Sequence, residues 1–419
     1  GGNAPDAARF TAVGDDDQNI YEWRGASPRF MSEFRTRFKA RSHSLLVNYR
    51  SKETIVRLTN HIASKIKVRI KDGEELVAND DRPGVQRVVR YSGGYHLTGL
   101  VKDVARSTLT GTTSVLTRTN NEAIMATAML EQHGVKARYI GGSDDFPVGR
   151  LREVRAFGQF VRERHPGIGV IPKEVWDNAV KEYIEGLKGN PLRADMKDLL
   201  ALFKKGNQGR HDLSEWDAFV REIRISDAVK PQKGVVHVST MHKSKGKEFN
   251  NVFVYQKNYP MEEDKDLRLL YVACTRSMDQ LVIHTNDQFL PTYKHASLIR
   301  ETNEVVYPRP NKLEYVLGMK EVNLGSCSYN SDRITSLSAG SNMVPDEKQF
   351  TNGSALGLGT GNGNVLLYAR KFIDSTLPRF ANEGYRVSGA TAEYIVHWYD
   401  KEKDKSYEVV LPRVQFTLG

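Results

Sequence analysis

Short apolar runs alternate with helical patterns through most of the first 290 residues. The segments near residues 52–66, 97–108, 121–132 and 266–277 carry apolar side chains at helical spacing. Strands punctuated by helices of this length predict an α/β layer with a largely parallel sheet, with functional loops at the carboxyl ends of the strands. The predicted strands are Arg9–Val13, Val85–Tyr91, Thr113–Thr117, Val135–Ile140, Val235–Ser239, Val252–Tyr255 and Gln280–His284.

Residues 150–228 carry a different pattern, in which apolar side chains recur only at helical spacing. Val175, Ala179 and Tyr183 form one such stripe, and similar stripes follow it. Pro172 and Pro191 stand where helices begin. The pattern predicts an all-helical insertion between two halves of one α/β domain.

Arg309 and Pro310 are expected to lie in a linker. The pattern changes again after them, and residues 313–419 predict a small, mainly β module. Its clearest signal is a hairpin, in which Tyr394–Tyr399 and Tyr407–Leu411 flank a charged turn. The Gly-rich stretch 357–363 is expected to be a flexible loop, and the stretch 346–349 a turn.

Composition excludes several classes of protein. Of the 419 residues, 39% are hydrophobic, which is enough for packed cores and excludes a disordered chain. Two distant cysteines, Cys274 and Cys327, exclude a disulfide framework, and no zinc-type spacing is present. No apolar run approaches the roughly 20 residues that span a bilayer. We therefore expect a cytoplasmic protein that does not enter membranes.

Positive charge is concentrated near the N-terminus. The chain has a formal charge of +10, and residues 20–71 alone hold 13 basic and 3 acidic side chains. Residues 313–419 have a net charge of −1. Such a field favours a polyanion such as a nucleic acid, although a solvated basic face would look the same. Phe30, Phe34 and Phe38, which interleave with the basic residues, are expected to form a core stripe.

The segment VGDDDQNIYEWRGA, residues 13–26, carries the densest candidate chemistry. An acidic loop after a strand suits a nucleotide and Mg²⁺, and Gln18 could bond a phosphate or orient water. Tyr21 and Trp23 offer faces for bases, and Arg24 offers a guanidinium. The three aspartates could equally be a charge cluster at a helix N-terminus.

As a whole string, this segment resembles motif III of the UvrD/Rep/PcrA family of superfamily 1A DNA helicases. Further strings resemble the family in the same order. NYRS at 48–51 is similar to motif IV, VSTMHKSKGKEF at 238–249 to motif V and LLYVACTR at 269–276 to motif VI. SVLTRTNN at 114–121 and LEQHGVKARYIGG at 130–142, followed by Phe146 and EVR at 153–155, resemble the second motor domain. The resemblance spans roughly residues 10–155 and 233–285.

The resemblance implies ATP with Mg²⁺ as cofactor, DNA as partner and a role for each matching residue. Gln18 would sense the γ-phosphate, Arg50 would contact it, and Arg276 would be the arginine finger. The implied nucleotide-binding residues are Tyr49, which would stack on the adenine, Glu248, which would accept a hydrogen bond from the ribose, and Gly246. The implied DNA-binding residues are Tyr21, Trp23, Arg24, Arg118, Asn120 and His242.

The chain also departs from the family. Lys247 stands where motif V has an apolar residue, and Ser277, Met278 and Asp279 follow Arg276 where small and basic residues are usual. Nothing reads GxxxxGK[ST], and no Asp-Glu pair follows an apolar strand. Both missing motifs precede motif III in the family, and the chain starts with Gly1 rather than Met. We therefore expect part of a larger motor, with no metal ligands of its own.

These patterns together predict an α/β, RecA-like second motor domain of the P-loop NTPase type with a short helical insertion and a mainly β C-terminal module. The expected boundaries are 1–47 for a remnant of the first motor domain, 48–149 and 233–295 for the second motor domain, 150–232 for a reduced 2B-like insertion, 296–312 for a linker, and 313–419 for the β module.

The expected function is the C-terminal part of an ATP-dependent 3′→5′ DNA helicase or translocase that is inactive alone. It would act on single-stranded or partly duplex DNA, in a bacterial-type cytoplasm near the nucleoid. The missing first motor domain would lie in the same or another chain. Two alternatives stay open, namely a non-catalytic module that binds single strands or a partner, and an ATPase half-site completed in trans.

Overall fold

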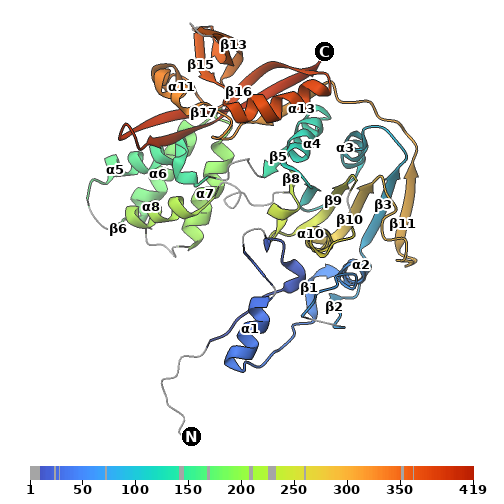
Figure 1. Ribbon diagram of the computed structural model, residues 1–419. Coiled ribbons are helices and arrows are strands. Elements are labelled where there is room, and N and C mark those ends of the chain that lie inside the picture. The colour runs from blue at the N-terminus through green and yellow to red at the C-terminus, as the bar shows by residue number, and fades with distance from the viewer. Residues whose placement is uncertain are drawn as a thin grey trace, which may run out of the picture. The chain divides into compact units, whose positions relative to one another are not determined.

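The computed structural model describes residues 10–22, 25–27, 29–70, 73–140, 146–167, 170–206, 211–224, 233–258, 261–350, 353–361 and 363–419. The chain forms two compact units, drawn in Figure 1. Unit 1 comprises residues 1–118 and 233–308, and unit 2 comprises residues 119–232 and 309–419. Across the described ranges, no helix is long and apolar enough to cross a membrane.

Unit 1 is built on a parallel sheet. Its strands lie side by side in the order β11 (Leu298–Asn303), β3 (Val85–Tyr91), β10 (Ser277–Thr285), β9 (Phe249–Gln256), β4 (Thr113–Thr117) and β8 (Val236–Thr240). Every pairing among them is parallel. The α/β class and the parallel sheet predicted from the sequence are confirmed.

Alternating side chains of these strands bury opposite faces of the sheet. Leu281 and Ile283 of β10 join one core with helices α2 (Glu53–Ala63) and α10 (Asp264–Cys274). Helix α3 (His96–Arg106) packs on β3, where Gly99 lies so close to the Tyr91 ring that an added Cβ would come within 2.4 Å of it. The two-residue period of the apolar runs therefore produces a sheet covered by helices.

The N-terminal part of unit 1 contains the short 3₁₀ helix η1 (Asp16–Gln18), helix α1 (Arg29–Phe38), and strands β1 (Val47–Lys52) and β2 (Val77–Asp80), which pair in parallel. The predicted strand at residues 9–13 is wrong for its described residues 10–13. They pair with no described strand, and Phe10 and Val13 are 71% and 85% exposed. A strand needs a neighbouring ladder, which the local pattern cannot supply.

The core stripe predicted for α1 is also wrong, because α1 has no buried residue and Phe30 and Phe38 are each 54% exposed. Phe38 instead contacts Phe34 and Phe10, with ring centroids 4.8 and 6.2 Å apart. The stripe exists at the predicted spacing, but within the described residues no second element buries it.

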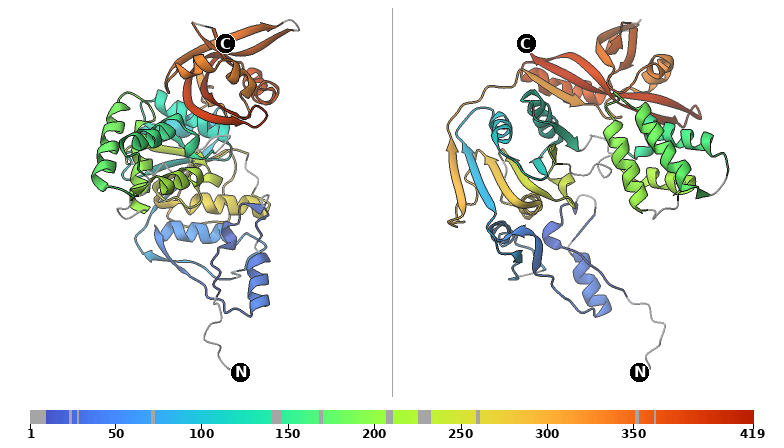
Figure 2. Two further views of the ribbon diagram at one scale, coloured as in Figure 1. Left: turned by 90° about the vertical axis from the view of Figure 1, so that its left-hand side faces the viewer. Right: turned by 180° about the vertical axis from the view of Figure 1, so that it is seen from behind.

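The first part of unit 2 is mainly helical (Figure 2), and the stretch from α5 to α8 is called the helical segment below. The elements of this part are α4 (Asn120–Gln132), β5 (Ala137–Ile140), η3 (Val148–Arg150), α5 (Arg152–Arg164), β6 (Val170–Ile171), α6 (Lys173–Gly186), α7 (Arg193–Gly206), β7 (His211–Asp212) and α8 (Leu213–Glu222). Four aromatic side chains from α5 to α8 form the centre of the segment. The ring of Phe157 lies 5.4 Å from that of Trp176 and 5.2 Å from that of Trp216, which in turn lies 5.2 Å from Phe203.

The rest of unit 2 is an antiparallel β module. Its strand order is β12 (Lys312–Val316), β17 (Lys405–Leu418), β16 (Tyr385–Asp400), β13 (Asn342–Phe350), β14 (Gly353–Thr360) and β15 (Gly363–Leu367). Short helices α11 (Leu324–Tyr329), α12 (Ser331–Thr335), η5 (Phe372–Thr376) and α13 (Leu377–Asn382) accompany it. The predicted hairpin is confirmed, since β16 and β17 pair from Asp400 and Lys405 outwards.

Two expectations about this module are wrong. The stretch 346–349 lies inside β13 rather than in a turn, and most described residues of the Gly-rich stretch 357–363 lie in β14 and β15. An added Cβ on Gly357 would lie 2.1 Å from the Leu366 carbonyl oxygen. The glycines therefore allow two strands to approach closely, a role that composition alone does not distinguish from flexibility.

The helical segment and the β module share one hydrophobic core within unit 2. Arg152 at the start of α5 contributes a polar link, because it donates to Glu408 of β17 at 2.5 and 2.6 Å and to the Ile334 carbonyl at 2.9 Å. Residues far apart in the sequence thus fold as one unit.

Candidate functional site

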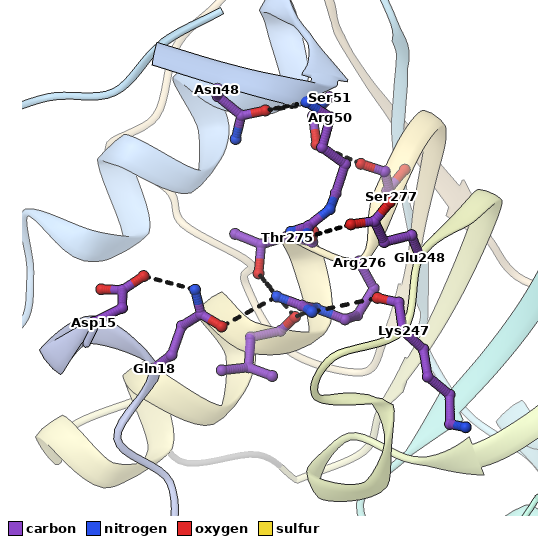
Figure 3. A network of polar contacts seen from close by, with 11 residues as sticks. Asp15, Gln18, Asn48, Arg50, Ser51, Lys247, Glu248, Thr275, Arg276 and Ser277 are labelled. Atoms are coloured by element: carbon purple, nitrogen blue, oxygen red, sulfur yellow. Dashed lines mark hydrogen bonds and ion pairs between the residues drawn. The ribbon is translucent and has the colours of Figure 1, made fainter. Parts of the chain in front are cut away.

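The carboxyl end of helix α10 holds two arginine side chains in unit 1 (Figure 3). Arg276 Nε donates to the Val272 carbonyl at 2.8 Å, and Arg50 Nη1 donates to the Thr275 carbonyl at 3.2 Å. The last carbonyls of a helix lack intrahelical partners and carry partial negative charge, so they suit guanidinium groups. The helix end therefore positions both cations.

Gln18 joins this cluster from the N-terminal segment. Its Oε1 accepts from Arg276 Nη2 at 3.3 Å, and its Nε2 donates to Asp15 Oδ2 at 2.6 Å. Arg276 Nη2 also donates to the Thr275 hydroxyl at 2.9 Å. Gln18 is thus placed beside the guanidinium of Arg276 although the two lie far apart in the sequence (Figure 3).

Arg50 is held by a turn of its own strand and by an acidic partner. Asn48 Oδ1 accepts from the backbone N–H groups of Arg50 and Ser51, each at 2.9 Å, and Ser51 Oγ donates to the Ser277 carbonyl at 2.6 Å. Arg50 Nη2 forms an ion pair with Glu248 Oε1 at 2.5 Å. The strings that resemble motifs IV, V and VI therefore meet at Arg50.

The two guanidinium groups affect each other electrostatically. Burial, followed by the nearby charge of Arg50, lowers the pKa of Arg276 to about 10, and the side chain remains a cation at neutral pH. Arg276 is 1% exposed, whereas the Arg50 side chain is 28% exposed. Arg50 Nε is buried and has no hydrogen-bond partner among the described residues. Two close cations with an unpaired donor favour an anion between them.

The three consecutive aspartates are occupied by protein partners. Asp17 accepts two hydrogen bonds from Arg69, both at 2.7 Å, and Asp16 Oδ2 accepts from the Ile70 backbone N–H at 2.5 Å. Asp15 caps η1. Their oxygens lie within 4.8 Å of one another. The aspartates lie at the N-terminus of η1, as a charge cluster would, and the spacing of their oxygens also permits a metal ion, so both interpretations stay open.

A second group of side chains adjoins Gln18. Tyr21 Oη donates to the His242 carbonyl at 3.1 Å, and the two rings lie 6.3 Å apart. Lys245 Nζ donates to the Gln18 carbonyl at 2.8 Å and lies 5.4 Å from the Tyr21 ring centroid. Burial lowers the pKa of both His242 and Lys245. Lys245 therefore bridges the Gln18 backbone and an aromatic ring.

The remaining predicted residues are placed as follows. Tyr49 is 79% exposed on β1, and Gly246 adopts φ +83° in the loop before β9. Arg118 pairs with the buried Asp266 at 3.1 Å. Asn120 begins α4 in unit 2, where its Oδ1 accepts from Tyr139. Trp23 and Arg24 lie outside the described residues.

The arginine cluster lies at the amino ends of the strands, contrary to expectation. Glu248 directly precedes β9, and Arg276 directly precedes β10. Among the predicted site residues, His242 and Gly246 follow β8, and Arg118 and Asn120 follow β4. The expectation of carboxyl-end loops was wrong for the cluster because the C-terminus of α10, and not a strand end, supplies its anchoring carbonyls.

Both departures from the family pattern have a structural account. Arg276 Nη1 donates to the backbone carbonyl of Lys247 at 3.3 Å, a contact that does not depend on the side chain, which points away from the cluster in Figure 3. Asp279 pairs with Lys52 at 3.1 Å and accepts from Asn250 at 2.6 Å. The ion pair between Asp279 of β10 and Lys52 of β1 therefore links β1 to the parallel sheet.

Three contributing residues were missed in the sequence, namely Thr275, Lys245 and Arg69. Thr275 and Lys245 lie inside the strings that resemble motifs VI and V, so their position beside Arg276 and Gly246 was an available signal. Arg69 offered none, because its pairing with Asp17 spans 52 residues of sequence.

Two stretches of the chain match known helicase families. Residues 235–284 match the UvrD-like helicase C-terminal domain, and residues 3–39 match the UvrD/REP helicase N-terminal domain. These two segments are similar to helicases of the UvrD/Rep type. The two matches lie on the segments that carry Arg276, Glu248 and Gln18.

Curated relatives agree with this likeness. ATP-dependent DNA helicase UvrD2 of Mycobacterium tuberculosis H37Rv is 24% identical over 320 residues, which cover 65% of this chain and 43% of UvrD2. ATP-dependent DNA helicase Rep of Escherichia coli K12 is 29% identical over 164 residues, covering 36% of this chain and 23% of Rep. Gabija protein GajB of Bacillus cereus VD045 is 23% identical over 290 residues, covering 65% and 56%. The chain thus spans less than two-thirds of the length of these relatives.

Among solved structures, the C-terminal domain of a possible DNA helicase from Lactobacillus plantarum matches 60% of this chain and 98% of its own length. The identity is 15% and the TM-score 0.28, which is too low to bear on the fold.

Proposed function

We propose that this chain supplies the second motor domain, and an edge of the first, to an ATP-dependent 3′→5′ DNA helicase or translocase of the UvrD/Rep type. The proposal rests on one observation above all. Gln18, Arg50 and Arg276, from three separate segments, converge at the end of α10 with two cations and a buried unpaired N–H. A module that only binds DNA would have no use for this arrangement. The domain boundaries expected from the sequence form part of the proposal.

The donor set fits a phosphate group. Helix carbonyls fix the guanidinium groups of Arg50 and Arg276, and Arg50 Nε is a donor without a hydrogen-bond partner among the described residues. ATP with Mg²⁺ would supply the phosphoryl group that is transferred to water. Arg276 would stabilise negative charge on that group, Arg50 would contact it, and Gln18 would act as the γ-phosphate sensor.

The neighbouring side chains suit the rest of the nucleotide. The exposed ring of Tyr49 would stack on the adenine. Glu248, about half exposed beside Arg50, would accept a hydrogen bond from the ribose. Gly246, whose φ of +83° favours glycine, would also contact the nucleotide. The phosphate-cradling loop and the Mg²⁺ ligands would come from a first motor domain, in the same polypeptide or in another.

The contacts around Lys245 support a link between nucleotide and DNA. Lys245 holds the Gln18 backbone and lies against Tyr21, which in turn bonds the His242 loop. A shift of Gln18 would therefore move two residues proposed to contact the strand. Arg118 and, from unit 2, Asn120 would add contacts to phosphates or bases, as would Trp23 and Arg24.

The proposal is tested by two assays on the purified 419-residue chain. Binding to a fluorescent oligothymidylate should weaken steeply with salt, because log K falls by roughly 0.7 per released counterion for single strands. ATP turnover should not rise above background with or without that oligonucleotide. Binding that is indifferent to salt, or robust turnover by the chain alone, would contradict the proposal. Tight binding together with turnover that stays absent after a first motor domain is added would favour the non-catalytic alternative.

A further inference from the structure

A groove of about 410 Å³ lies in unit 2 between helices α6 and α7, within the helical segment. Its apolar lining includes Val180 and Ile184, one helical turn apart on α6, and Leu200 and Ala201 on α7. Side chains three or four residues apart form ridges on each helix, and two neighbouring ridges leave a groove between them. A volume in the range of roughly 300–1,000 Å³ is typical of ligand sites.

The rim of the groove carries unbalanced positive charge. Asp177 pairs with Lys204 at 2.9 Å, and Glu185 pairs with Arg193 at 3.3 Å, so both acidic residues of the lining are neutralised. Lys181 on α6 and Lys197 on α7 also line the groove, are exposed, and form no ion pair with any described residue. One free cation therefore stands on each helix beside an apolar floor.

The nature of the floor decides between two kinds of anionic ligand. Single strands bind such surfaces by stacking bases on exposed aromatic rings. The one aromatic ring of the lining, Trp176, is 1% exposed and packs against Phe157, His211 and Trp216 inside the segment. Of the apolar lining, Val180 is partly exposed and Ala201 exposed, and both are aliphatic, so the groove suits an apolar side chain rather than a stacked base.

From this geometry we infer that the α6–α7 groove binds an acidic peptide segment of a partner protein. A bulky apolar side chain of the peptide would fill the space over Val180, Ile184 and Ala201, and its carboxylates would pair with Lys181 and Lys197. Shape and charge are then complementary at one place, which provides specificity beyond either alone. This site is independent of the arginine cluster in unit 1.

The inference is tested by fluorescence anisotropy with the full chain and a fluorescein-labelled peptide of four aspartates followed by phenylalanine. We expect saturable binding at about 1 mM or tighter, where 1 mM corresponds to roughly −4.1 kcal/mol. A peptide with asparagines for aspartates, and one with alanine for phenylalanine, should each bind about tenfold more weakly. No saturation, or equal affinity for all three peptides, would overturn the inference.

Variants locate the site. Lys181→Glu combined with Lys197→Glu, and separately Ala201→Glu, should weaken binding at least about tenfold, because each places negative charge in the groove. Lys205→Glu is the matched control, since Lys205 is an exposed lysine of α7 outside the lining, and it should change affinity less than about twofold. Circular dichroism is the control that each variant is folded.

Two further results would count against the inference. If Lys205→Glu weakens peptide binding as much as the groove variants do, the peptide binds through the overall charge of the helices and not in the groove. Release of the peptide by oligothymidylate from the native chain, when the groove variants also lose oligothymidylate binding, would instead assign the groove to nucleic acid. An Arg276→Ala chain should bind the peptide normally, so that a failure here and a failure of the proposed motor function are distinguishable.

Discussion

At the scale of single residues, the site depends on how guanidinium groups are fixed before any ligand arrives. Arg276 bonds the Val272 and Lys247 carbonyls, and Arg50 bonds the Thr275 carbonyl. Such contacts require several N–H groups in a rigid plane, which Arg has and Lys lacks. The sequence indicated Gln18, Arg50 and Arg276 through their motif strings, but the carbonyl anchors and the Arg69–Asp17 pair depend on the folded backbone and could not be predicted.

Tyr21 provides a test at this scale. Replacing Tyr21 with Ala should weaken single-strand binding by the stacking energy of one base, roughly 1–3 kcal/mol, or about 5- to 150-fold in affinity. Fluorescence titration with oligothymidylate measures the change. Tyr329→Ala is the control, because Tyr329 is 84% exposed in the β module and should leave binding unchanged. Equal effects of the two variants would remove Tyr21 from the DNA contacts.

At the scale of elements, local patterns predicted strands well where the sheet buries them. The predicted Val85–Tyr91 and Thr113–Thr117 coincide with β3 and β4. Predictions were wrong where a distant neighbour decides the outcome. Residues 10–13 pair with no described strand, α1 buries no side chain, and the glycines of β14 permit a close strand contact. Periodicity specifies what a segment can form but not what lies against it.

Arg152 tests the link between the helical segment and the β module. Removing its side chain with Arg152→Ala leaves Glu408 and two backbone carbonyls with fewer partners, and should lower the free energy of unfolding by about 2–4 kcal/mol. Urea denaturation followed by tryptophan fluorescence measures it. Arg155→Ala, an exposed position on the same helix, should cost less than about 0.5 kcal/mol. A loss that small for Arg152→Ala would show the link to be unimportant.

His211 makes the stability of the helical segment depend on pH. Its ring is fully buried against Trp176, with centroids 4.7 Å apart, and neither ring nitrogen has a partner among the described residues. Burial lowers its pKa in the folded state. Below the unfolded value of about 6.5 the unfolded chain binds the proton more readily, so stability is full above that pH and falls by up to about 1.4 kcal/mol per pH unit beneath it.

His211→Phe should remove this contribution, because phenylalanine keeps the ring contact without a proton site. The difference in urea midpoint between pH 7.5 and pH 5.5 should shrink relative to the native chain. His397, whose pKa burial also lowers, is retained in both proteins and cancels from the comparison. An unchanged difference would assign the acid sensitivity to other groups.

At the scale of the whole molecule, charge and core follow different divisions of the chain. The surplus of basic over acidic residues lies in the first 312 residues. It is densest in residues 20–71, which begin just after Gln18 and include Arg50. The helical segment and the β module, which the sequence presents as separate, share a core in unit 2. The sequence could not predict that union, because it rests on long-range contacts such as that of Arg152 with Glu408.

The central claim is that Arg276 serves ATP hydrolysis in a complete motor. Its most direct test is ATP turnover, in the presence of oligothymidylate, by this chain joined to a first motor domain that carries the phosphate loop and Mg²⁺ ligands. Arg276→Ala should lower turnover by about 10³-fold or more, by the magnitude known for arginine fingers, and Arg276→Lys should not restore it. Oligothymidylate binding and circular dichroism should stay unchanged. A folded Arg276→Ala protein with near-normal turnover would contradict the account.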